Sequence, residues 1–91
     1  MSMSLAQKLA ADSIAAVAEG RNLQDMLAQI RAAHPELTAQ ENGALQDIAY
    51  GCQRYLGSLK HMLAQMLKKP IDNPQLESLL LAAMYQLHYT R

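Results

Sequence analysis

An apolar stripe that stays in helical phase from Leu45 to Leu67 is the feature that most constrains how this chain can fold. Its members recur at spacings of three and four and pass through Gly57 without a shift, which is the period of an α-helix. They are Leu45, Ile48, Ala49, Cys52, Leu56, Leu59, Leu63, Met66 and Leu67. Upstream, Thr38-Ala39-Gln40-Glu41 forms a capping box that marks a helix start. We therefore expect one long helix over 39–67, roughly 43 Å at 1.5 Å per residue, with Gly57 as the place for a kink.

Three shorter helices are expected around the long one. The first covers about 4–19 and ends at Gly20, a residue suited to a left-handed cap. The second follows Asn22, an N-cap, and closes before Pro35, because a residue that precedes proline disfavours helical geometry. The last begins at Asn73-Pro74, an N-cap with proline in the first turn. Alanine and leucine supply 30 of the 91 residues whereas Val, Ile and Thr supply seven, which favours an all-α fold of about four helices.

The last expected helix is apolar on nearly every side. One face carries Leu76, Leu79, Leu80, Ala83, Met84 and Leu87, and the opposite face carries Leu81, Ala82, Tyr85 and Tyr89. Such a helix needs cover on both sides, and the three preceding helices supply it on one. We expect the second face to be left uncovered and to be an interface, through which the isolated chain forms a homodimer. Residues 1–91 are then one domain, with 1–67 as a first three-helix unit and 74–91 as the first helix of a second.

No pattern in the chain predicts catalysis, a metal or a cofactor. Cys52 falls inside the apolar stripe, where a small buried thiol is expected rather than a nucleophile. His61 lies nine residues further on and nearly opposite on the helix, so the two side chains cannot meet within it. There is no glycine-rich phosphate loop and no H-E-x-x-H pattern. We expect a chain that is not itself an enzyme and that holds no cofactor.

The charge balance excludes a broad electrostatic field. Eight Lys and Arg balance eight Asp and Glu, so nothing drives the whole chain onto nucleic acid or a membrane. The single cysteine excludes an internal disulfide and fits a reducing compartment. No apolar run approaches the ~18 residues that a membrane span needs. We expect a cytoplasmic protein with no membrane partner, whose binding to any nucleic acid is local.

A basic ridge on the long helix is the candidate for such local binding. Arg54, His61 and Lys68 recur at intervals of seven and so share one side of that helix. Cations along one helix edge can follow the phosphates of RNA. The alternative is a solvated face, favoured by the zero net charge and by Asp47 on the same line. With two flanking lysines included, the candidate RNA-binding residues are Arg54, Lys60, Lys68 and Lys69.

Three stretches of the chain carry a family resemblance. They are Leu45-Gln46-Asp47-Ile48-Ala49-Tyr50-Gly51-Cys52-Gln53-Arg54, Leu67-Lys68-Lys69-Pro70, and Leu79-Leu80-Leu81-Ala82-Ala83-Met84-Tyr85-Gln86-Leu87-His88-Tyr89-Thr90-Arg91. With these elements in this order, the chain resembles the N-terminal NusB-like domain of the Sun/Fmu proteins, the RsmB methyltransferases that make 5-methylcytosine in small-subunit ribosomal RNA. The resemblance covers nearly the whole chain, since 11–27 fits the first two helices of that domain.

The resemblance implies a helical bundle related to the transcription antitermination factor NusB, of which this chain is a truncated part. It implies an RNA-binding accessory domain that helps to position ribosomal RNA. The methyltransferase domain of the full-length protein is then its partner, and that domain binds S-adenosylmethionine. Gly51 and Arg54 carry over as signature positions, the glycine for close helix approach and the arginine for an interhelical bond or for RNA.

The resemblance leaves two functional classes open. Where NusB has an arginine-rich first helix, the first helix expected here offers only Lys8, so binding of ribosomal RNA by this chain alone is expected to be weak. The alternative to an RNA-binding accessory domain is a free-standing helical module for protein interaction or dimerisation that touches no RNA.

Overall fold

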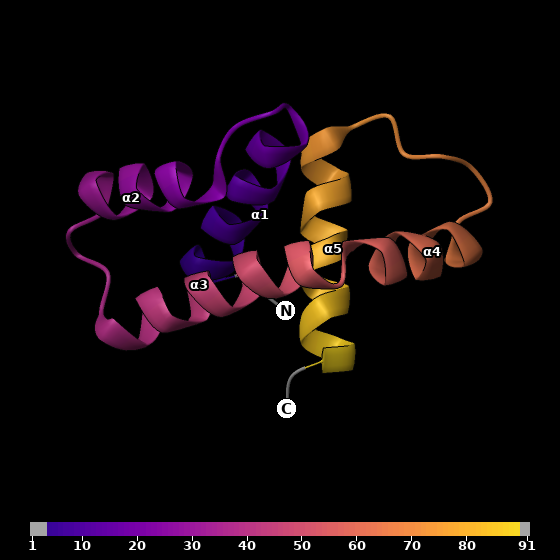
Figure 1. Cartoon of the computed structure of the whole chain (residues 1–91). Helices are drawn as coiled ribbons and strands as arrows, with labels where there is room; N and C mark the ends of the chain where they lie inside the picture. The colour runs from indigo at the N-terminus through magenta and orange to yellow at the C-terminus, as the bar shows by residue number, and fades with distance from the viewer. Residues whose placement is uncertain (1–3, 90–91) are drawn as a thin grey trace.

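The computed structural model describes residues 4–89, which fold into helices joined by short turns and loops, with no strand in that range (Figure 1). The all-α prediction is confirmed, although the described residues form five helices where about four were expected. In chain order the helices are α1 (Leu5–Ala18), α2 (Leu23–Ala33), α3 (Ala39–Arg54), α4 (Leu56–Met66) and α5 (Pro74–Tyr89). No helix in residues 4–89 is both long enough and apolar enough to cross a membrane.

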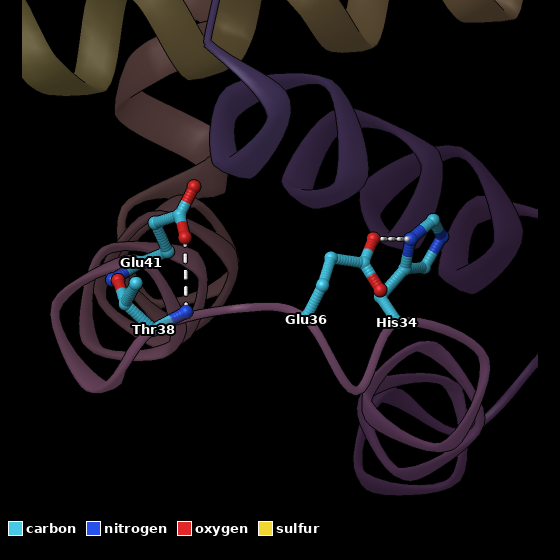
Figure 2. Close-up of polar contacts among 4 residues, drawn as sticks. All are labelled: His34, Glu36, Thr38 and Glu41. Carbon is cyan, nitrogen blue, oxygen red and sulfur yellow. Dashed lines mark hydrogen bonds and ion pairs between the residues drawn. The ribbon is translucent and has the colours of Figure 1, made fainter.

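The helix starts lie where the capping residues predicted them. At α3, the Thr38 hydroxyl accepts from the Glu41 amide at 3.1 Å and the Glu41 carboxylate accepts from the Thr38 amide at 2.9 Å, the contact drawn in Figure 2. The Asn22 side chain caps α2, and the Asn73 side chain accepts from two amides at the start of α5. Gly20 has a φ of +100°, which an L side chain rarely adopts, so the turn after α1 depends on glycine. These features are local, and local sequence is enough to predict them.

The prediction of one continuous helix over 39–67 is wrong. Tyr55 leaves helical geometry, with φ −109° and ψ 21°, and separates α3 from α4. The helical geometry also stops at Met66, because Leu67 is extended. Gly57, the expected kink, is an ordinary helical residue of α4. Because the break takes up a single residue, the apolar stripe stays in phase across it and gives no sign of it.

The break at Tyr55 lies where α5 packs against the chain. In Figure 1, α3 and α4 run nearly end to end and α5 crosses them close to their junction. At that point the Tyr55 ring stacks on Tyr89 of α5, with 4.1 Å between ring centroids. α3 contacts α1, α2 and α5, whereas α4 packs against α5 and the adjoining α3. The two halves of the expected helix therefore pack against different sets of helices.

The core is centred on α1, which packs against α2, α3 and α5. Its buried side is made largely of small residues, so the neighbouring helices can approach closely; Ala6, Ala10, Ala11 and Ser13 all lie there. The buried Ser13 hydroxyl donates to the Leu9 carbonyl oxygen at 3.0 Å and is thereby satisfied. Fully buried leucines from the other helices fill the centre, and each contributes roughly 1.5 to 3 kcal/mol through burial. The largest fully buried apolar side chains are Leu27, Leu45, Ile48, Leu59 and Leu81.

The structure corrects which face of α5 is covered. The face expected to be an uncovered interface is the one that packs inside the chain: Leu81 and Ala82 are each 1% exposed and Tyr85 is 6% exposed. Tyr89 lies at the edge of this face and is 38% exposed. Because α5 is apolar almost all round, its sequence could not tell which side would meet α1 and α3. Leu81, Ala82 and Tyr85 are therefore unavailable as the homodimer interface that was predicted.

Candidate nucleic-acid interface

The zero net charge conceals an uneven distribution along the chain. Between Asp47 and Asp72 there is no acidic residue, yet this segment carries four of the eight Lys and Arg residues. It covers the end of α3, the whole of α4 and most of the loop before α5. Charges this close together act locally even when the total is zero, because salt at physiological strength screens interactions beyond about 8 Å. The four cations are Arg54, Lys60, Lys68 and Lys69.

Three of these cations surround a groove of about 340 Å³ between α4 and the start of α5. We call it the lysine groove. Lys60 comes from α4, whereas Lys68 and Lys69 come from the loop that follows it. Leu63 and Leu67 contribute to its apolar lining, and both pack on the core. The complete lining is Lys60, Leu63, Ala64, Leu67, Lys68, Lys69, Pro70, Ile71 and Glu77.

One carboxylate faces the lysines of this groove. Lys60 Nζ lies 3.9 Å from Glu77 Oε1, and both side chains are partly open to solvent. Such a surface pair contributes about 0.2 to 1 kcal/mol, so it holds Lys60 only loosely. Within residues 4–89, no acidic side chain lies within ion-pair distance of Lys68 or Lys69. The groove therefore keeps a positive surplus that an anionic ligand could neutralise.

The predicted straight ridge of cations does not exist. Lys68 and Lys69 follow the end of α4 instead of continuing a helix, and the break at Tyr55 separates Arg54 from the lysines. The Arg54 guanidinium carbon lies 5.6 Å from the centre of the Tyr55 ring, a cation–π arrangement. The four predicted residues therefore form two groups, with three lysines around one groove and Arg54 beside a set of aromatic rings.

Those rings line a second hollow of about 240 Å³, where the end of α3 meets the end of α5. We call it the tyrosine pocket. The Tyr55 and Tyr89 rings are nearly parallel, at 11° and 4.1 Å between centroids, and the Tyr85 ring lies 5.9 Å from that of Tyr89. Offset aromatic pairs of this kind stabilise one another by about 0.5 to 1.5 kcal/mol beyond burial. The pocket is lined by Asp47, Tyr50, Gly51, Arg54, Tyr55, Tyr85 and Tyr89.

Gly51 makes this arrangement possible. A Cβ atom at Gly51 would overlap the ring of Tyr85, so the α5 ring lies directly against the α3 backbone. The expectation that Gly51 allows a close helix approach is confirmed, and the approaching group is the Tyr85 side chain. By contrast, nothing lies within 4 Å of a Cβ placed at Gly43 or Gly57.

A hydrogen bond fixes the inner wall of the pocket. The Tyr85 hydroxyl donates to Asp47 Oδ1 at 2.9 Å. Burial, together with this bond and the Asp47 charge, raises the pKa of Tyr85 to about 12. Tyr85 is therefore neutral across the physiological pH range, and Asp47 keeps its second oxygen for other donors: within residues 4–89, no hydrogen bond reaches Oδ2 of Asp47.

Cys52 and His34, two potentially reactive side chains, lie in different environments. Cys52 is completely buried, as predicted, and burial followed by the Asp47 charge raises the pKa of its thiol to about 12. His34 pairs with the exposed carboxylate of Glu36 at 3.1 Å, as Figure 2 shows. A backbone hydrogen bond, assisted by His34, lowers the pKa of Glu36. No group of three His, Cys, Asp or Glu side chains in residues 4–89 is placed to hold a metal ion.

The tyrosine pocket was not predicted from the sequence. Two signals for it were present: Tyr85 and Tyr89 lie one helical turn apart, and Arg54 and Tyr55 follow Tyr50 on the other element. Neither signal reveals that the two sets meet, because that depends on how α5 crosses α3.

Fold and site together define a small all-helical module with a basic groove and an aromatic pocket. Comparison with known families then identifies it: the chain belongs to the NusB family, whose model matches residues 4–91. The resemblance stated from the sequence is confirmed by this match and by the curated relatives.

The curated relatives are ribosomal RNA small subunit methyltransferases B. That of Pectobacterium carotovorum is 33% identical over 84 residues, which cover 87% of this chain and 20% of the relative. The Pseudomonas putida protein is also 33% identical over 84 residues, covering 90% of this chain and 19% of the relative. The Sodalis glossinidius protein is 33% identical over 86 residues, which cover 91% of this chain and 19% of the relative. The chain thus spans about a fifth of the length of these relatives. No solved structure matches it significantly.

Proposed function

We propose that this chain is an RNA-binding accessory domain that helps to position small-subunit ribosomal RNA for methylation. The observation that carries the proposal is the lysine groove, where three cations face one partly exposed carboxylate. The relatives support the choice of RNA, since their name is that of a ribosomal RNA small subunit methyltransferase. The cytoplasm, where ribosomal RNA is modified in bacteria, is the corresponding location.

In this proposal the transfer chemistry belongs to a separate catalytic domain. Cys52, the only thiol, is buried and has a raised pKa, which opposes a role as a nucleophile. A methyltransferase domain with its S-adenosylmethionine would supply the reaction. The accessory domain would supply phosphate contacts that hold the RNA near that domain, and linkage of the two raises the effective concentration of substrate.

The number of cations limits the affinity. If Arg54 and the three lysines each neutralise one phosphate, the logarithm of the binding constant for single-stranded RNA should fall with the logarithm of salt at a slope of about −3. Contacts to phosphates alone give dissociation constants of about 10⁻⁴ to 10⁻⁶ M. The domain alone is therefore a weak binder, and tight binding requires contributions from its partner domain.

Fluorescence anisotropy with a labelled single-stranded segment of small-subunit ribosomal RNA tests the proposal. The variant Lys60→Ala/Lys68→Ala/Lys69→Ala should bind at least about tenfold more weakly at low salt. A matched control, Lys8→Ala/Arg21→Ala/Arg31→Ala, removes the same charge from α1, the following turn and α2. Its affinity for the RNA should fall by less than about threefold. Equal losses in both variants would mean that the groove is not the binding site. Absence of binding by the unaltered chain at low salt would reject the RNA-binding function.

A further inference from the structure

We propose that the tyrosine pocket receives one unpaired nucleobase of the bound RNA, and that Asp47 makes the pocket prefer cytosine to uracil. This inference rests on the proposed function and assigns a separate part of the RNA contact. The lysine groove would hold phosphates, which carry no sequence information, whereas the pocket would read a base.

The rings of the pocket offer a stacking surface. Tyr50 is 45% exposed and Tyr89 is 38% exposed, and both line a hollow of about 240 Å³. Aromatic side chains beside a cation are the usual surface on which unpaired bases stack. Arg54 supplies the cation: it lines the same pocket and its guanidinium is placed over the Tyr55 ring. When a base stacks on Tyr89, the Arg54 guanidinium would therefore lie close enough to interact with the phosphate of the same nucleotide.

The rigidity of the pocket favours a base over a loosely fitting ligand. Tyr85 lies against the Gly51 backbone, its hydroxyl is held by Asp47, and Tyr55 and Tyr89 stack at 11°. The planes of these three rings are thus held before a ligand arrives, which reduces the entropy lost on binding. A base within a duplex already stacks on its neighbours and does not present its faces, so the occupant must be unpaired.

Asp47 supplies the preference for one kind of base. A carboxylate only accepts hydrogen bonds. Its Oδ1 accepts from Tyr85, and within residues 4–89 no donor occupies Oδ2. Cytosine presents the N4 amino group to such an acceptor, whereas uracil presents the O4 carbonyl oxygen at the same place and would be repelled. Among pyrimidines the pocket should therefore select cytosine.

The two sites can act on one RNA strand. Tyr55 stands at the start of α4, and the loop carrying Lys68 follows its end. α4 has 11 residues, so its axis is about 16 Å long at 1.5 Å per residue. A short single strand laid along α4 could place phosphates at the lysine groove and a base in the tyrosine pocket.

The test compares labelled octamers of cytidine and uridine by anisotropy. The unaltered chain should bind the cytidine octamer about five- to tenfold more tightly. Asp47→Asn should remove this preference and keep binding of the uridine octamer, while Asp12→Asn on α1, the matched loss of one charge, should keep the preference. Retained binding of the uridine octamer shows that the Asp47 variant is folded.

Tyrosine variants test stacking separately. Tyr89→Ala should weaken binding of both octamers by about tenfold, and Tyr89→Phe, which keeps the ring, should restore it. Tyr50→Ala, at a more exposed ring, provides a second variant with little risk to folding. It should also weaken the binding of both octamers.

The outcomes separate this inference from the proposed function. If binding depends on the three lysines but is equal for both octamers and indifferent to Tyr50→Ala and Tyr89→Ala, the pocket does not receive a base and the RNA-binding function stands. If neither octamer nor the ribosomal RNA segment binds the unaltered chain, both proposals fall together. Occupation of the pocket by a peptide, with no effect of the tyrosine variants on RNA, would also overturn the inference.

Discussion

The tyrosine pocket and the lysine groove lie toward opposite ends of α4 and are built in opposite ways. The pocket rests on a buried ring against a glycine backbone, so its shape is part of the packing between α3 and α5. The groove presents long cationic side chains with one loose ion pair among them. A phosphate can be neutralised by a mobile charge, whereas stacking on a base requires a fixed plane. Changes at the buried wall of the pocket, Gly51 and Tyr85, should therefore affect folding, whereas changes in the groove should affect only binding.

The largest effect on stability is expected from Gly51→Leu. Leucine is the better helix former, by under about 1 kcal/mol, but its side chain must displace the Tyr85 ring. Overpacking normally costs about 1 to 3 kcal/mol, and this site should lie near the upper end. Urea unfolding followed by circular dichroism measures the change. Unaltered or increased stability would mean that α5 does not pack on α3 as described.

A smaller loss is expected from Tyr85→Phe, which keeps the ring and removes the hydrogen bond to Asp47. A hydrogen bond to a charged group contributes about 1.5 to 3 kcal/mol at most, and the exposure of Asp47 places the expected loss nearer 1 kcal/mol. The variant also tests the pH dependence. Folding raises the pKa of Tyr85 from 10.0 to about 12, so the native state holds this proton more tightly than the unfolded state.

The stability linked to this proton is fully present below about pH 10 and is lost as the pH rises toward 12. Cys52, whose pKa rises from 9.0 to about 12, adds a loss of the same sign that begins near pH 9. Melting temperatures between pH 8 and 12 should therefore fall for the unaltered chain and fall less steeply for Tyr85→Phe. Parallel curves for the two proteins would show that Tyr85 does not contribute to alkaline unfolding.

A modest gain is expected from alanine at the glycines that do not contact neighbours. Gly43 in α3 and Gly57 in α4 have open space where a Cβ would lie. Alanine at either position should stabilise by about 0.5 to 1 kcal/mol through helix propensity alone. These variants are the counterpart of Gly51→Leu, since they show the effect of the residue type without the steric conflict. A loss of stability in Gly57→Ala would indicate that the helix bends at Gly57.

The smallest effect on stability is expected from the groove. Lys60→Ala/Lys68→Ala/Lys69→Ala removes exposed side chains and one ion pair at 3.9 Å. The free energy of unfolding should change by no more than about 0.5 kcal/mol. A larger loss of stability in urea unfolding would mean that the groove is part of the packing. The groove would then contribute to folding as the pocket does.

The same contrast separates what the sequence could predict from what it could not. The capping residues Thr38, Asn22 and Asn73 act within one turn, so their helices start where expected. The break at Tyr55 escaped prediction because a single non-helical residue leaves the apolar period in phase. The inward face of α5 escaped it because a helix that is apolar all round has no periodic signal to orient it.

Some features of the candidate sites could likewise be predicted from the sequence, and others could not. The four cations could be named from the sequence, because their chemistry is a property of each residue. Their grouping could not be, since it depends on the end of α4 at Met66 and on the stack of Arg54 over Tyr55. The Asp47–Tyr85 bond joins residues 38 positions apart and required the tertiary structure.

The most direct test of the account is the salt dependence of RNA binding, measured from low to moderate salt by anisotropy on one single-stranded RNA. The unaltered chain should give a slope of about −3, and the three-lysine variant about −1, because it retains only Arg54 of the four cations. Tyr89→Ala should bind more weakly at every salt concentration but keep the slope of about −3, since stacking releases no counterions. Equal slopes for the unaltered chain and the three-lysine variant, or a slope that collapses in Tyr89→Ala, would contradict the division into a phosphate-binding groove and a base-binding pocket.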